Sequence, residues 1–79
     1  MILPYMARSA IAAEVRAQIA RSGKTNLDVA AETGIPTSTF SHKTSGRSPF
    51  LAEELVAIAR ALGIMPSVMI PADALERAA

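Results

Sequence analysis

The sequence contains no cysteine, no tryptophan, one histidine, one tyrosine and two phenylalanines. Without cysteine, disulfide bonds and thiolate metal sites are excluded, which fits a reducing compartment. One histidine and scattered carboxylates form no cluster with metal-ligand spacing, so we expect neither a metal site nor a cofactor. The opening stretch MILPYMARSA has too short an apolar run for a signal peptide or a membrane span. We therefore expect a cytoplasmic chain that has no membrane partner.

What the sequence has in abundance is alanine within a hydrophobic fraction of 51%. A chain of 79 residues has room for one domain, at 1–79, barely above the size at which a single core suffices. Many alanines and few aromatic residues favour closely packed helices over a sheet. We therefore predict one all-α domain.

Hydrophobic periodicity divides the chain into four helices. The first is predicted from Ser9 to Ser22, where Ile11, Val15 and Ile19 recur at four-residue spacing. The others are predicted at 26–33, 36–44 and 51–62, and the last of these carries an apolar stripe of Leu55, Ile58, Ala59 and Leu62. A fifth short helix is predicted to begin at Pro71. The apolar start at 1–5 reads equally as a disordered segment or as a strand-like arm.

The stretch at 25–46 predicts two short helices joined by a tight turn. Thr25 can cap the first helix, and Asp28, three residues later, completes a shortened capping box. Gly34 follows an apolar-periodic run, where a left-handed conformation ends a helix without steric strain. Pro36 suits the first turn of the next helix, because its missing N–H would have no partner there. Ala30 is small enough for two helices to cross closely, so the stretch has the physical requirements of a helix-turn-helix.

The net charge is only +1, but the basic residues are concentrated around this turn. Between 21 and 47 the charged residues are Arg21, Lys24, Lys43 and Arg47 against Asp28 and Glu32. After Ser48 they are Arg60 and Arg77 against Glu53, Glu54, Asp73 and Glu76. A localised positive patch is what contact with phosphate requires, although ordinary solvated charges would look the same.

These residues together resemble the lambda-repressor-like, or Xre/Cro-type, DNA-binding domains. The resemblance covers about 11–64: the pattern V-R-x-x-I-x-x-S-G-x-T-N-x-x-V-A-x-x-T-G-I-x-x-S-T-F-S resembles the first three helices of the family, and GRSPFLAEELVAIARALGI at 46–64 resembles its fourth. The resemblance implies a four- to five-helix domain with a central helix-turn-helix, whose recognition helix falls at 36–44.

The resemblance also places the DNA contacts. Base-reading positions of the family fall on Thr37, Ser38 and Ser41, with His42 flanking them; helix capping and solvated surface remain the alternative for these side chains. Positions that bind phosphate fall on Asn26, Arg47 and Ser48, and charge alone adds Lys24 and Lys43. Serine, threonine and histidine discriminate bases weakly, so we expect modest specificity per half-site. Thr39 is expected to point away from this face and to pack or cap.

Two departures from the family pattern bear on the site. Thr33 and Lys43 occupy places that are often apolar, which leaves open which way Lys43 faces. Many family members pair an arginine of the first helix with a glutamate late in the recognition helix, and those places fall here on Ile19 and Thr44. Both charges are absent together, so no buried ion is left without a partner.

The resemblance implies a small transcriptional repressor that binds a double-stranded DNA operator, most simply as a homodimer on DNA. We expect the dimer contact in the tail at 64–79, within the apolar segment 64–70. The alternative is a small protein-binding module, such as an antitoxin, whose main partner is another protein. We do not expect an enzyme, because Ser38, His42 and Asp28, the residues that could suggest a catalytic triad, have no glycine-rich oxyanion loop beside them. We also expect no small-molecule ligand. The operator sequence and the choice between repressor and activator are not encoded in these patterns.

Overall fold

The computed structural model describes residues 5–71, and it describes side chains from Arg8 onward. Over this range the chain is all helical and contains no strand, which confirms the predicted all-α class. The elements are α1 (Tyr5–Ser22), α2 (Asn26–Thr33), α3 (Thr37–Thr44), α4 (Ala52–Leu62) and the 3-10 helix η1 (Pro66–Met69). Of the start at 1–5, which was expected to be disordered or a strand-like arm, only Tyr5 is described, and it is the first residue of α1. The helix predicted to begin at Pro71 lies, beyond that residue, outside the described part of the chain.

The helix boundaries agree with the predicted ones except at three starts. Helix α1 begins at Tyr5 instead of Ser9, because the intervening Met, Ala and Arg favour a helix and nothing interrupts it. Helix α3 begins one residue after Pro36, whose backbone is extended (φ −56°, ψ 140°) while its carbonyl accepts the Phe40 N–H at 2.8 Å. Pro36 thus stands at the N-cap of α3, just outside its first turn. Likewise Leu51 is the N-cap of α4 and not its first residue.

The predicted caps of α2 are confirmed. The Asp28 N–H donates to Thr25 Oγ1 at 3.1 Å, and the Thr25 N–H donates to Asp28 Oδ2 at 2.9 Å, which is a reciprocal capping box. At the other end Gly34 has φ +76°, and its N–H donates to the Ala30 carbonyl at 3.0 Å. A side chain there would strain the backbone, so glycine is what allows the chain to leave α2 and start α3 within three residues.

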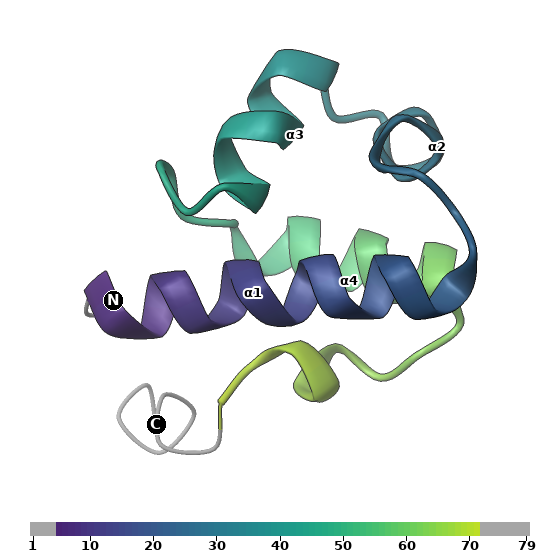
Figure 1. The fold of residues 1–79 in the computed structure, drawn as a ribbon. Helices are drawn as coiled ribbons and strands as arrows, with labels where there is room; N and C mark the ends of the chain where they lie inside the picture. The colour runs from purple at the N-terminus through teal and green to yellow at the C-terminus, as the bar shows by residue number, and fades with distance from the viewer. Residues whose placement is uncertain (1–4, 72–79) are drawn as a thin grey trace.

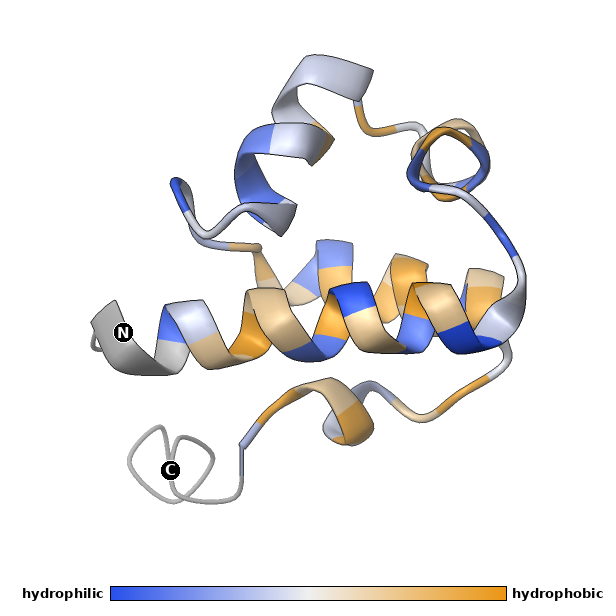
Figure 2. Ribbon diagram, in the orientation of Figure 1, coloured by the Kyte–Doolittle hydropathy of each residue, from blue (hydrophilic) through white to orange (hydrophobic). Residues whose placement is uncertain are grey.

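The helices form a layered arrangement (Figure 1). Helices α1 and α4 pack against each other, α2 and α3 cover them on one side, and η1 covers them on the other. In this view α2 is seen along its axis while α3 is seen across its axis, so the two helices cross steeply. Hydrophobic residues are frequent along α4 and η1 and alternate with hydrophilic ones along α1, whereas α3 is composed largely of polar residues (Figure 2).

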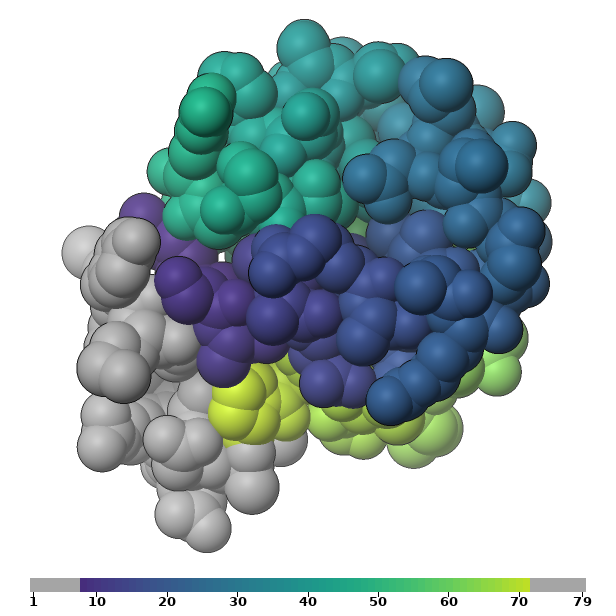
Figure 3. Space-filling model, in the orientation of Figure 1, coloured from purple at the N-terminus to yellow at the C-terminus, as the bar shows by residue number. Residues whose placement is uncertain are grey.

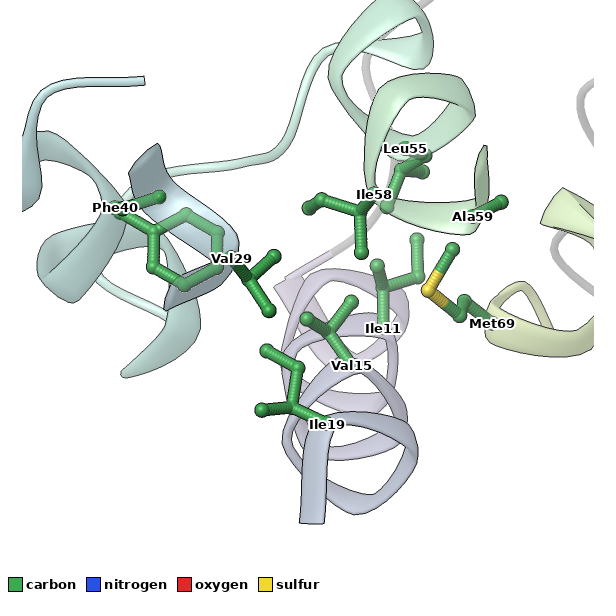
Figure 4. Close-up of a cluster of buried hydrophobic side chains, with 10 residues drawn as sticks. Ile11, Val15, Ile19, Val29, Phe40, Leu55, Ile58, Ala59 and Met69 are labelled. Carbon is green, nitrogen blue, oxygen red and sulfur yellow. The ribbon is translucent and has the colours of Figure 1, made fainter. Parts of the chain in front are cut away.

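The core lies where these elements meet. Val15, Val29 and Ile58 are completely buried at its centre, and Phe40 brings α3 into it (Figure 4). The Phe40 ring meets the ring of Phe50 edge to face, with centroids 6.1 Å apart, and so ties the loop after α3 to the same core. Among the described residues, the buried apolar cluster contains Ile11, Val15, Ile19, Val29, Ala30, Phe40, Leu55, Ile58, Ala59 and Met69. The periodic apolar residues that predicted the first and last helices all belong to it except Leu62, which packs partly buried against it.

Candidate functional site

Helix α3 has two sharply different faces. Phe40 and Thr44 are buried against the rest of the molecule. At 100° per residue, the expected base-reading residues fall within one arc of about 140° that begins beside the buried Thr44. All four, Thr37, Ser38, Ser41 and His42, are exposed. Thr39 is also exposed and does not pack, contrary to expectation, and it lies about 160° around the helix from Ser41. Helix α3 therefore has a buried side, formed by Phe40 and Thr44, and an exposed polar side formed by Thr37, Ser38, Ser41 and His42, which we call the outer face.

The hydroxyl groups of this helix differ in whether they already have partners. At its C-terminal end, Thr44 Oγ1 donates to the Ser41 carbonyl at 3.1 Å and Ser45 Oγ donates to the His42 carbonyl at 2.8 Å. By contrast, the hydroxyls of Thr37, Ser38 and Ser41 bond to no other residue that the structure describes. Their donors and acceptors are therefore available to a ligand laid along the outer face.

Three of the groups expected to bind phosphate lie on the segments that flank α3 in the chain, at the start of α2 and in the loop after α3. Asn26 is exposed at the first residue of α2, where the helix dipole favours an anion. Arg47 is exposed just after α3, and its backbone N–H donates to the His42 carbonyl at 3.0 Å, so its backbone is fixed to the last turn of α3. Ser48 is half-buried next to it. In Figure 3, α2 and α3 form one continuous end of the molecule.

The two lysines of the expected phosphate set have partners within the protein. Lys24 Nζ lies 2.8 Å and 3.0 Å from the Glu32 carboxylate oxygens and donates to the Ala61 carbonyl at 3.0 Å. Lys43 Nζ lies 2.5 Å and 2.6 Å from the two Glu54 oxygens. The Lys43 side chain is only 13% exposed and faces α4, which answers the question that the sequence left open.

One polar contact to α3 was not predicted from the sequence. The Arg16 guanidinium, from α1, donates a hydrogen bond to the Thr44 carbonyl at the end of α3. It satisfies a carbonyl that has no partner within the helix, at the end where the dipole favours a cation. Ile19 and Thr44 are both buried, so no charge is orphaned at the places where family members carry an ion pair. Nothing in the local sequence around Arg16 signals this contact across 28 residues.

The stretch of chain that contains α3 carries basic residues and no acidic ones. No aspartate or glutamate occurs between Glu32 and Glu53, a stretch that includes all of α3 and the loop after it. Both carboxylates of α2 have partners within the protein: Glu32 pairs with Lys24, and Asp28 is committed to the capping box, where the hydrogen bonds from Thr25 hold its pKa below the ordinary value. The outer face of α3 therefore carries nothing that would repel a polyanion.

The apolar segment 64–70 is divided between core and surface. Met69 is completely buried, and Ile64 and Ile70 pack partly buried against the core. The segment is expected to cover part of the core and to use the rest of its apolar side chains for a dimer contact; Met69 belongs to the part that covers the core, against α1 and α4 (Figure 4). Met65 and Val68 are the members left exposed, at 68% and 46%.

Within residues 5–71 no group of three or more histidine, aspartate or glutamate side chains is placed to hold a metal ion. No helix in that range is both long enough and apolar enough to cross a membrane. Comparison of the sequence with protein-family models, with curated proteins and with solved structures found no match.

Proposed function

We propose that this chain is a lambda-repressor-like, or Xre/Cro-type, helix-turn-helix protein that binds double-stranded DNA in a sequence-specific way. In this proposal α3 lies in the major groove, and Thr37, Ser38, Ser41 and His42 contact base edges. The major groove of B-DNA admits one α-helix, and each base pair presents a distinct pattern of donors and acceptors there.

One observation carries the proposal: the outer face of α3 is polar, exposed and free of carboxylates, while its inner face is anchored in the core. Short hydroxyl side chains let the helix backbone approach the floor of the groove closely, and hydroxyls both donate and accept. The free hydroxyls of Thr37, Ser38 and Ser41 suit base contact for that reason. The rigid root at Phe40 fixes their orientation, which base discrimination requires.

The contacts that fix the register on DNA are assigned to Asn26, Arg47 and Ser48. Arg47 is a fully ionised group on an exposed loop, and Asn26 adds the N-terminal end of α2. Such contacts strengthen binding to every sequence and make it dependent on salt. Together with base contacts from α3, they support an operator-binding repressor that acts in the cytoplasm.

We further propose that two copies bind one operator. A single recognition helix of eight residues covers only a few base pairs, too few to distinguish a site among roughly a million competitors. Pairing on a two-fold operator solves this problem when the half-sites lie about one helical turn apart. Since Met69 is committed to the core, the contact is assigned to the exposed Met65 and Val68.

The proposal is tested by selecting bound duplexes from a random library and comparing two hydroxyl deletions. Ser41→Ala removes a group from the outer face, and we expect it to change the preferred sequence and to weaken the best site by about 1–3 kcal/mol. Thr39→Ala removes the same chemistry from the opposite side of α3 and serves as the matched control. If both variants select the wild-type sequence with wild-type affinity, α3 does not read bases through this face.

A protein-docking module remains the second candidate, because Met65 and Leu27 are the most exposed large apolar side chains among the described residues. The salt dependence of binding separates the two candidates. DNA binding weakens steeply with salt, by a slope of about −0.9 for each phosphate contacted. Docking through apolar side chains is expected to show almost no such slope.

A further inference from the structure

Lys43 and Glu54 form the more enclosed of the two ion pairs found among residues 8–71. Their side chains are 13% and 15% exposed, against 35% and 43% for Lys24 and Glu32. The Lys43 ammonium lies within 2.6 Å of both Glu54 oxygens. An ammonium held this closely by a carboxylate, and largely shielded from water, is neutralised by its partner, and separating the two would expose an uncompensated charge.

Glu54 is itself held in place by the start of α4. Its carboxylate accepts the Leu51 N–H at 2.7 Å, and it lies in the first turn of the helix, where the dipole favours a negative charge. The partner that Lys43 meets is therefore a fixed group on α4 and not a mobile surface carboxylate. Lys43 connects the last turn of α3 to the first turn of α4.

The same turn of α3 is held from a second direction. The Arg16 guanidinium of α1 donates to the Thr44 carbonyl, one residue after Lys43. The end of α3 is thus joined by polar contacts to both α1 and α4, while Phe40 anchors its middle in the core. These contacts together determine how far the outer face of α3 is rotated and tilted.

We propose that Lys43 and Glu54 are positioning residues, which fix the orientation of α3 for base readout, and that Lys43 makes no phosphate contact. This inference rests on the DNA-binding function proposed above and deepens it. Lys43 lies about 160° around the helix from Ser41, so it points away from the groove when the outer face enters it. A phosphate could bind Lys43 only by replacing Glu54 as the partner of the Lys43 ammonium.

The consequence concerns specificity more than affinity. Contacts to phosphate tolerate small displacements of a helix, whereas base contacts require the polar groups to be held within about half an ångström. Loss of the pair should therefore lower affinity for the preferred duplex more than affinity for a scrambled one.

The experiment measures binding of wild type and variants to the selected duplex and to a scrambled duplex, over 50–200 mM salt and well below each Tm. Lys43→Met keeps the aliphatic stem and removes the charge, and Lys43→Arg keeps the charge and can pair with Glu54 through two hydrogen bonds. Glu54→Gln removes the charge of the partner, and Glu53→Gln removes an exposed carboxylate from the same turn as a matched control. Arg47→Ala provides the reference for loss of a phosphate contact.

We expect Lys43→Met to leave the salt slope unchanged and to reduce the ratio of specific to scrambled affinity about three- to tenfold. Glu54→Gln should reduce the ratio similarly, Lys43→Arg should restore it, and Glu53→Gln should leave it at the wild-type value. A fall of about one unit in the salt slope of Lys43→Met, equal to that of Arg47→Ala, would overturn the inference, because Lys43 would then bind phosphate. An unchanged ratio in both Lys43→Met and Glu54→Gln would overturn it as well. If wild type itself shows no salt-dependent binding to duplex DNA, the proposed function fails, and the positioning role fails with it.

Discussion

Removal of the Met69 side chain tests how the core is closed. Met69 is fully buried on η1, and its side chain lies beside Ile11 and Ala59 in the layer between α1 and α4 (Figure 4). Met69→Ala removes apolar contact from both helices and leaves a cavity, which destabilises a domain by about 2–5 kcal/mol. A chain of 79 residues has a total stability of roughly 4–12 kcal/mol, so the variant loses a large part of it.

The matched control lies four residues earlier. Met65 has the same side chain in the same segment but is 68% exposed, so Met65→Ala should change the free energy of unfolding by less than about 0.5 kcal/mol. Urea titrations followed by circular dichroism at 222 nm give both values. We expect the midpoint of Met69→Ala to fall by more than about 1 M while that of Met65→Ala is unchanged. Equal midpoints for the two variants would refute the assignment of Met69 to the core.

Four further substitutions test folding stability, DNA binding and assembly. Hydrogen bonds from Thr25 lower the pKa of Asp28 in the folded state, so the contribution of Asp28 to stability is present above the unfolded pKa of 3.8 and is lost as pH falls through the lower folded pKa. Asp28→Asn should therefore be less stable than wild type at neutral pH but should approach the wild-type stability in acid. Thermal unfolding measured over pH 2–7 tests this. Gly34→Ala should destabilise by about 1–2 kcal/mol through its φ of +76° alone, because a Cβ there meets nothing within 4 Å; a denaturant midpoint equal to wild type would contradict this. Arg47→Ala should weaken binding to all duplexes alike and reduce the salt slope by about one unit, and a loss confined to one duplex would instead place Arg47 in a groove. Met65→Asp should leave the fold intact but abolish cooperative uptake of two chains by a full operator in analytical ultracentrifugation, and unchanged cooperativity would place the dimer contact elsewhere.

Local features were predictable because short-range physics determines them. The capping box of Thr25 and Asp28 depends on residues three apart, and the left-handed turn at Gly34 depends on one residue type. The apolar stripe of α4 follows from the period of 3.6 residues, and Leu55 and Ile58 are buried as that period requires. The base-reading positions on α3 were expected from the resemblance to the family, and the structure shows that all four side chains are exposed.

Features that depend on tertiary packing were not predictable from sequence. Lys43 is basic, and only the placement of α4 shows that Glu54 is its neighbour. The segment 64–70 is apolar throughout and interrupted by Pro66, so no period indicates that Met69 is buried while Met65 is exposed. The contact between Arg16 and the Thr44 carbonyl joins distant parts of the chain, and its acceptor is a backbone group that every residue carries.

The central claim is that the outer face of α3 meets DNA, and nuclear magnetic resonance tests it most directly. Isotope-labelled protein is titrated with a duplex that carries one half-site of the sequence selected from the random library, and the backbone amide shifts are followed residue by residue. The account predicts that the largest shift changes cluster at 36–48 and at the start of α2 around Asn26, while η1 changes little in the half-site complex. Shift changes concentrated at Met65 and Val68, with α3 unaffected, would contradict it.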